Sequence, residues 1–131
     1  MSHIVEAKTA GIVHPDAELL RQAATLVAQR HGGTIETFYL DYYGKRYNAP
    51  LAVFTPELRH GIGITVDEAT GELTFVGDPW GVKVAFEQIQ QELLQPYVSL
   101  ATIQVLEAMG YSTQALDGEQ GQVVIQGVSY A

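Results

Sequence analysis

Four histidines are the first residues in this sequence whose chemistry could be catalytic or metal-binding. They are His3, His14, His31 and His60. Their spacing matches neither one helical turn nor neighbouring strand positions, whereas a zinc site takes three or four converging ligands. Because the chain has no cysteine, thiolate metal sites, disulfides and cysteine nucleophiles are excluded. We predict that the protein holds no metal and uses no cofactor.

Acidic residues and glycines supply two further motifs, and both have a structural explanation. Asp67, Glu68 and Glu72 crowd one predicted hairpin tip, but a calcium loop of the EF type needs a longer spaced set of oxygens. Gly61-Ile62-Gly63 lacks the further glycine and the lysine of a phosphate loop, and it falls within a predicted strand. No Gly-x-Ser-x-Gly or Ser-His-Asp pattern is present. We therefore assign no catalytic residue and favour a non-enzyme over an enzyme.

One cluster of aromatic and basic residues indicates binding. Such residues are enriched at interfaces, because a tyrosine ring buries a large area while its hydroxyl stays wet. Two interpretations stay open, a half-buried rim of a sheet and a patch for a ligand or partner. The cluster surrounds a predicted turn and contains Tyr39, Tyr42, Tyr43, Tyr47, Lys45 and Arg46.

The longest predicted element is a helix that opens after Gly77. Asp78 is suited to cap it, because a carboxylate can accept from the free N–H groups of the first turn. Pro79 suits the first helical position. We predict that Trp80 is buried there and that Phe86 lies on the apolar stripe that faces the core. Asp78, Pro79, Trp80 and Phe86 are thus the predicted structural anchor of the fold.

The same helical pattern continues towards Gly110 but is interrupted at Pro96. A proline inside a helix removes one hydrogen bond and crowds the preceding turn, so we expect a kink or a break near Gln95. From Tyr97 to Met109 apolar residues occupy more than one side. This distribution predicts that the second half of the helix is covered on several sides.

The remaining elements predict an α+β fold. A shorter helix is expected from Ala17 until Gly32-Gly33 stops it, and Thr55 to His60 is expected to be a loop. Glycines at positions 61 and 63 leave one strand face bare, which favours a close-packed helix or backbone against it. The predicted strands span residues 3–10, 34–41, 47–54, 61–66, 73–76, 111–116 and 122–130. The order β-α-β-β-β-β-α-β-β, in a single domain of residues 1–131, indicates an antiparallel sheet with one short and one long helix packed on one face.

Charge is distributed unevenly along the chain. The net charge is −8, and every Lys and Arg lies at or before Lys83. An acidic surface repels a phosphate backbone, so we expect no nucleic-acid partner. The acidic C-terminal third is either a solvated face or a dock for a basic protein partner. No signal peptide and no apolar segment long enough to span a bilayer is recognised, so we expect a cytoplasmic protein without membrane contact.

Short motifs spread over nearly the whole chain carry a resemblance to a known family. They are Met1-Ser2-His3, Lys8-Thr9, Gly61-Ile62-Gly63-Ile64, Pro79-Trp80-Gly81-Val82, Phe86, Gln95, Tyr97 and Gly110-Tyr111. In this order and spacing the chain resembles the hypothetical chloroplast open reading frame 35 family, a domain of unknown function in cyanobacteria, red-algal plastids and other bacteria. His31-Gly32-Gly33 and Pro96 depart from the family pattern. The resemblance implies a soluble intracellular protein with an accessory role, and it brings no catalytic residue.

We interpret the chain as a small non-catalytic interaction or accessory module. Its contact would be the sheet edge, the tyrosine-rich turn or the acidic C-terminal third, and self-association into a homo-oligomer is left open. The alternative is a small-ligand-binding protein or an undescribed enzyme with a site between sheet and helices. A deep pocket with buried titratable groups favours the alternative, whereas a flat apolar patch favours the interaction module.

Overall fold

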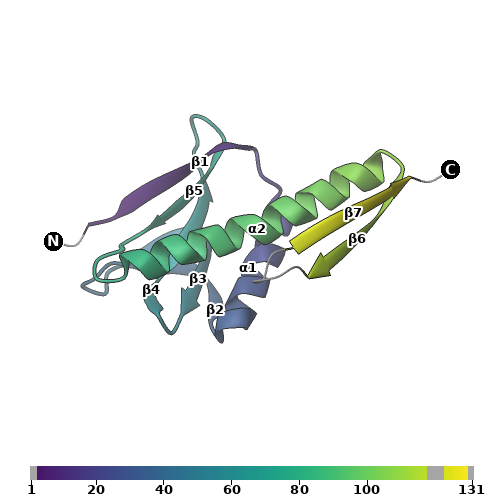
Figure 1. Cartoon of the computed structure of the whole chain (residues 1–131). Coiled ribbons are helices and arrows are strands. Elements are labelled where there is room, and N and C mark those ends of the chain that lie inside the picture. Colours follow the sequence, from purple (N-terminus) through teal and green to yellow (C-terminus); the bar gives the residue numbers. More distant parts are fainter. Residues whose placement is uncertain (1–2, 118–122, 130–131) are drawn as a thin grey trace.

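A computed structural model describes the backbone of residues 3–117 and 123–129 and the side chains of residues 3–9 and 11–111. Within these residues the chain forms seven strands and two helices in the predicted order. The strands are β1 (Val5–Val13), β2 (Thr34–Leu40), β3 (Arg46–Thr55), β4 (Leu58–Val66), β5 (Glu72–Gly77), β6 (Tyr111–Asp117) and β7 (Val123–Ser129), and the helices are α1 (Ala17–His31) and α2 (Lys83–Ala108). The α+β class, with one short and one long helix, is confirmed (Figure 1).

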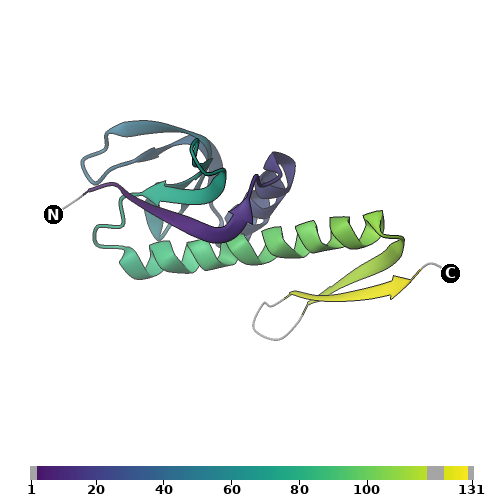
Figure 2. The same cartoon turned by 90° about the horizontal axis from the view of Figure 1, so that it is seen from above.

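Five strands form one antiparallel sheet in the order β1-β5-β4-β3-β2, and the last two form a separate two-stranded sheet. The larger sheet grows by hairpins from β2 to β5, and β1 joins its edge beside β5. The β6–β7 hairpin lies along the second half of α2, on the side turned away from the larger sheet (Figures 1 and 2). The predicted turn between β6 and β7 lies, from residue 118 on, outside the described residues.

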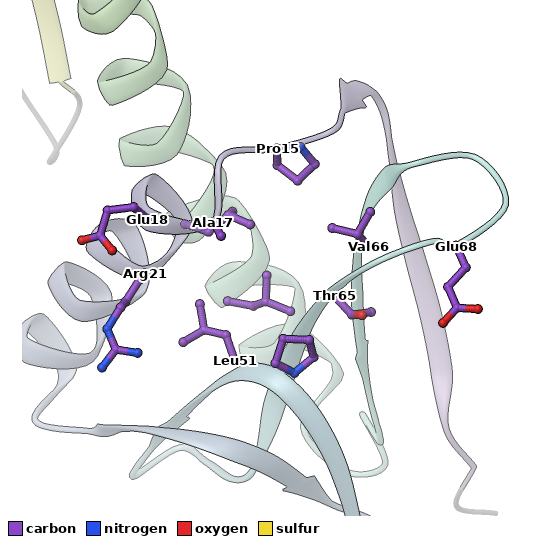
Figure 3. Close-up of a pocket in the computed structure, with 11 residues that line it drawn as sticks. Pro15, Ala17, Glu18, Arg21, Leu51, Thr65, Val66 and Glu68 are labelled. Atoms are coloured by element: carbon purple, nitrogen blue, oxygen red, sulfur yellow. The ribbon is translucent and has the colours of Figure 1, made fainter.

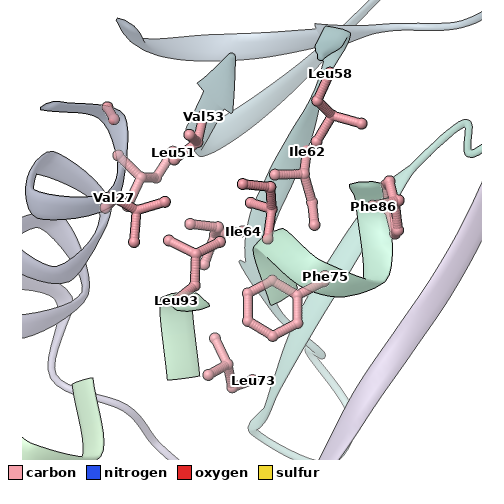
Figure 4. Close-up of a cluster of buried hydrophobic side chains, with 13 residues drawn as sticks. Val27, Leu51, Val53, Leu58, Ile62, Ile64, Leu73, Phe75, Phe86 and Leu93 are labelled. Carbon is pink, nitrogen blue, oxygen red and sulfur yellow. The ribbon is translucent and has the colours of Figure 1, made fainter. Parts of the chain in front are cut away.

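Both helices cover the same face of the five-stranded sheet, and the main core lies between them and the sheet. Ile62 and Ile64 of β4 and Phe75 of β5 belong to this core (Figure 4). Val27 of α1 and Leu93 of α2 close it from the helix side. The alternation of apolar residues along the strands and the apolar stripes of the helices explain this arrangement, because each element must bury one face.

The ends of α1 follow from the residues beside it. Asp16 is the N-cap, because its carboxylate accepts from the backbone N–H of Leu19 at 3.0 Å. Gly32 ends the helix in the left-handed conformation with φ 67°, which a glycine adopts without strain. The N–H of Asp16 also donates to the hydroxyl of Tyr97 at 3.1 Å. This bond ties the start of α1 to the middle of α2.

The start of α2 differs from the prediction. Its N-cap residue is Val82, without a side-chain capping bond, so Asp78 does not cap the helix. Trp80 is not buried either, because 48% of its surface is exposed, whereas Phe86 is only 3% exposed. The cause is a separate turn ahead of the helix, in which the N–H of Val82 donates to the carbonyl of Pro79 at 2.9 Å.

Pro96 lies inside α2 without breaking it. The helix runs continuously from Lys83 to Ala108, so the break expected near Gln95 does not occur. Both views show one straight ribbon (Figures 1 and 2). Leu93 and Tyr97, on either side of the proline, are buried. Their packing holds the two halves in line although the proline removes one helical hydrogen bond.

The predicted loop from Thr55 to His60 is shorter than expected. Strand β4 begins at Leu58, which leaves only two residues between β3 and β4. Thr55 and Leu58 pair directly across the turn, and the Thr55 hydroxyl accepts from the N–H of Leu58 at 3.1 Å. The threonine side chain thus closes a tight turn where a longer loop was predicted.

The β2–β3 hairpin bends across the face of the sheet that the helices leave free. Tyr39 lies over Gly63, where a Cβ atom would come within 2.9 Å of the tyrosine ring, and it packs against Val76 in a second, smaller core. Phe54 covers Gly61 in the same way, at 2.8 Å from a Cβ atom. The bare glycine face is therefore filled by aromatic side chains, not by the helix or backbone that was expected.

Candidate functional site

A buried carboxylate joins two loops that are distant in the sequence. Asp78 is 2% exposed. One of its oxygens accepts from the backbone N–H of Tyr42 at 2.8 Å, and the other accepts from the N–H of Trp80 at 3.1 Å. Tyr42 lies in the β2–β3 turn, and Trp80 lies between β5 and α2. Because a buried carboxylate requires such donors, it fixes the two loops relative to each other.

Three exposed aromatic side chains stand on these loops, and we call Tyr42, Tyr43 and Trp80 the aromatic surface. Their exposed fractions are 51%, 80% and 48%. The rings of Tyr42 and Tyr43 meet edge to face with their centroids 5.4 Å apart. Single exposed apolar residues are ordinary on a folded protein, but a group of them marks an interaction site. The aromatic surface is therefore the candidate site for a partner.

The structure divides the predicted tyrosine cluster into an inner and an outer pair. Tyr39 and Tyr47 stack with their ring centroids 5.3 Å apart. The hydroxyl of Tyr47 donates to Asp41 at 3.1 Å, and burial together with this bond raises the pKa of Tyr47. Burial likewise raises the pKa of Tyr39. The inner pair belongs to the sheet, as the rim interpretation predicts, while Tyr42 and Tyr43 face solvent. That the outer pair forms a patch for a ligand or partner stays a prediction.

Cations border the aromatic surface. Lys45 and Arg46 are exposed at the end of the β2–β3 turn. Lys45 lies over the ring of Tyr47, 5.3 Å from its centre, and Arg46 lies over the ring of Phe38, 3.8 Å from its centre. Lys83 borders a hollow of about 200 Å³ beside Trp80. The carboxylates of the same loops, Asp41 and Asp78, accept hydrogen bonds from the loops themselves. Three exposed cations thus lie on or next to the two loops that carry the aromatic surface, which suits contact with carboxylates.

A pocket of about 490 Å³ lies between the start of α1 and strands β3 and β4 (Figure 3). This is where a ligand-binding protein or enzyme was expected to hold its site. Leu51 contributes to an apolar floor, and the charged lining residues Glu18, Arg21 and Glu68 are all exposed. Figure 3 shows the charged groups of Glu18 and Arg21 pointing away from the pocket. A ligand site gathers polar groups onto its ligand, and this pocket does not.

The histidines do not form a metal centre in the part of the chain that the structure describes, where no group of three or more His, Asp or Glu could hold an ion. The Nε2 atom of His31 lies 2.7 Å from a carboxylate oxygen of Glu92, and Arg30 reaches the other oxygen at 3.7 Å. This contact links the end of α1 to α2. His60 lies beside Tyr42, with their ring centroids 6.2 Å apart.

The acidic hairpin tip is a turn closed by one carboxylate. Asp67 accepts from the backbone N–H groups of Ala69 and Thr70 at 2.8 Å and 3.0 Å and pairs with Lys8 at 2.9 Å. The hydrogen bond from Lys8, followed by those from the turn, lowers the pKa of Asp67 to about 2. Its oxygens therefore stabilise the turn itself.

Sequence reasoning missed the part that Asp78 and Trp80 play in this site. It assigned both to the start of the helix, because Asp-Pro is a common helix-start signature. Gly81 was the signal that could have separated them. Its φ of 74° is a turn conformation that other residues avoid, so it marks a turn ahead of the helix.

No known protein family model matches the chain, and no curated protein and no solved structure matches it either. The resemblance to the open reading frame 35 family therefore stays a prediction. Among the residues that the structure describes, neither helix has the length and hydrophobicity that a membrane crossing requires.

Proposed function

We propose that this protein is a non-catalytic interaction module that binds an acidic segment of a partner protein on its aromatic surface. The observation that carries the proposal is the bridge made by Asp78. It holds the β2–β3 turn and the β5–α2 loop together and leaves Tyr42, Tyr43 and Trp80 exposed.

Aromatic residues on a fixed backbone are efficient binding residues. Tyr and Trp bury a large rigid ring while losing little conformational freedom, and they are frequent among the residues that dominate interface energetics. A loop that is already ordered adds no ordering cost to association. Truncating such a residue at the centre of an interface typically costs about 2 kcal/mol or more of binding free energy.

Charge favours an acidic segment over other partners of this surface. Lys45, Arg46 and Lys83 are exposed, and carboxylates on the partner would meet them around the rings. Nucleic acid is less suited, because a net charge of −8 repels a continuous phosphate backbone from the rest of the molecule. The proposed setting is the cytoplasm, in an accessory role.

Two other contacts that the sequence suggested are less well supported. The pocket beside α1 lacks converging polar groups, which weakens the ligand-binding alternative. In the acidic C-terminal third, Glu92 already contacts His31 and Arg30, so it is less available to a basic partner.

Site-specific photo-crosslinking tests the proposal. A photoreactive phenylalanine analogue replaces Tyr43 in cells of the source organism, and a control carries it at Leu26, which is 48% exposed on α1. We expect an acidic protein to be crosslinked from position 43 and not from position 26. The same protein captured equally from both positions would contradict the proposal.

The purified partner then allows a direct measurement in solution. Trp80 is the single tryptophan, so its emission should shift when the partner binds. The double variant Tyr42→Ala, Tyr43→Ala should weaken binding at least about tenfold. The double variant Lys45→Gln, Lys83→Gln should also weaken binding, and the loss of affinity should be larger at low salt than at high salt. Unchanged affinity in both variants would show that the partner does not bind on the aromatic surface.

A further inference from the structure

One side of α2 beyond Tyr97 is apolar and uncovered, although this half was expected to be covered on several sides. Val98, Val105 and the C-cap residue Met109 are 49%, 58% and 66% exposed. With Thr102 they stand at offsets of four, three and four residues, the heptad spacing that lines up side chains on one side of a helix. We call these four residues the heptad stripe.

The polar atom in the heptad stripe is satisfied within the helix. The hydroxyl of Thr102 donates to the carbonyl of Val98 at 2.7 Å. Its methyl group can therefore complete an apolar contact without leaving a hydrogen-bonding group unpaired. The stripe spans about 16 Å of helix at a rise of about 1.5 Å per residue.

The heptad stripe contributes to one wall of an apolar groove of about 420 Å³. The other wall is the end of β1, from Gly11 to Val13, and Val13 is 49% exposed. The groove therefore lies between the second half of α2 and β1, the edge strand of the five-stranded sheet. Because Val13, Val98 and Val105 are exposed, the groove is accessible from solvent.

The charge of the chain limits where a second copy of it could bind. The lining residues are all uncharged, and no Asp, Glu, Lys or Arg occurs between Glu92 and Glu107. Two copies of a chain with net charge −8 repel each other, so they can associate only where no carboxylates meet. A twofold contact places the same surface on both sides, and the heptad stripe meets this condition.

We propose that two copies of this chain pair through their heptad stripes, with the α2 helices antiparallel. In this arrangement Val98 faces Met109 of the second copy, and Thr102 faces Val105. In the antiparallel orientation the five-stranded sheets of the two negatively charged copies lie at opposite ends of the helix pair. In a parallel pair they would lie side by side and repel each other. The dimer is independent of the aromatic surface, so each proposal can fail without the other.

Sedimentation of the purified chain tests the dimer. At about 100 µM protein we expect a mass twice the 14.3 kDa of the monomer. Val105→Glu should raise the dissociation constant at least about tenfold, because it buries a charge in the contact. The matched control is Val84→Glu, the same exchange at a residue of α2 that is 79% exposed and lies outside the groove. It should leave the dimer unchanged.

Several outcomes would overturn the dimer. A monomeric parent chain would do so, as would equal dissociation by both variants or by neither. Far-UV circular dichroism shows that the variants are folded, and Met109→Glu, at a residue 66% exposed, is a second disrupting variant. Raising the salt concentration from about 0.05 M to about 0.5 M should strengthen the dimer, because salt screens the repulsion between the two negatively charged copies. A dimer weakened by salt would contradict the uncharged contact.

The absence of cysteine allows the orientation to be read from single-cysteine variants. Val98→Cys and Met109→Cys chains are mixed and oxidised, and the products are identified by intact mass. The antiparallel pair predicts the mixed disulfide between positions 98 and 109, because a disulfide needs Cα atoms about 4.4–6.8 Å apart. Disulfides that join equal positions, 98 to 98 or 109 to 109, would show a parallel pair and refute the arrangement.

Discussion

Replacing Asp78 by alanine should release both loops of the aromatic surface and destabilise the fold. The carboxylate is 2% exposed and accepts from the N–H groups of Tyr42 and Trp80 at 2.8 Å and 3.1 Å. Hydrogen bonds to a charged group contribute about 1.5–3 kcal/mol each, and a buried group left unpaired costs about 1–3 kcal/mol. Because the loops can relax and admit water, we expect a total loss of about 2–5 kcal/mol.

Urea unfolding followed by far-UV circular dichroism measures this loss. With a slope of about 1.5–2 kcal/mol per molar urea, the midpoint should fall by roughly 1–3 M. Asp78→Asn should lose less, because its amide oxygen can still accept one of the two bonds. Glu68→Ala, at an exposed hairpin tip, is the control and should change stability by no more than about 0.5 kcal/mol.

Amide hydrogen exchange tests the structural part of the prediction. The N–H groups of Tyr42 and Trp80 should exchange faster in Asp78→Ala, while the amides in the centre of β4 should change only with the global stability. Unfolding at the parent's midpoint, or unchanged exchange at both amides, would refute the reasoning. The aromatic surface would then not be held by Asp78.

Three further predictions concern the fold. Trp80→Ala should cost about 1–2 kcal/mol because the side chain is 48% exposed and only half of it is buried. Phe86→Ala, at a residue 3% exposed, should cost about 3–5 kcal/mol; urea unfolding that gives the reverse order would contradict the assignment of buried and exposed positions. Gly63→Ala should cost about 1–3 kcal/mol in the same assay, because its Cβ would come within 2.8 Å of Val76 and 2.9 Å of Tyr39, and a neutral result would mean that the hairpin does not cover the glycine. The pKa of Asp67 is lowered from 3.8 to about 2, so the stability it contributes is present above pH 3.8 and lost as the pH falls through about 2. Asp67→Asn cannot titrate and should flatten this acid limb of the unfolding profile, and an identical limb in parent and variant would exclude the effect.

Much of the local structure could be predicted from the sequence, because the interactions that cause it are local. Asp16 and Gly32 mark the two ends of α1 through hydrogen bonds and backbone conformations within one turn. The alternation from Ile62 to Val66 predicts a strand since successive side chains point to opposite faces. The order of the elements and the α+β class follow from such signals. Charge is also a property of the sequence, so the uncharged span between Glu92 and Glu107 is visible without a structure.

The candidate site depended on contacts between distant residues. The pair Asp-Pro is typical of a helix start, but the carboxylate of Asp78 instead accepts a hydrogen bond from the N–H of Tyr42, which lies 36 residues earlier. Which tyrosines stay exposed depends on how the β2–β3 hairpin bends over Gly63, and the exposure of Trp80 follows from the turn ahead of α2. Burial is set by what packs against a side chain, and residues far apart in sequence supply that packing. Periodicity could therefore predict the helices and strands, while only the tertiary structure decided which aromatic residues face solvent.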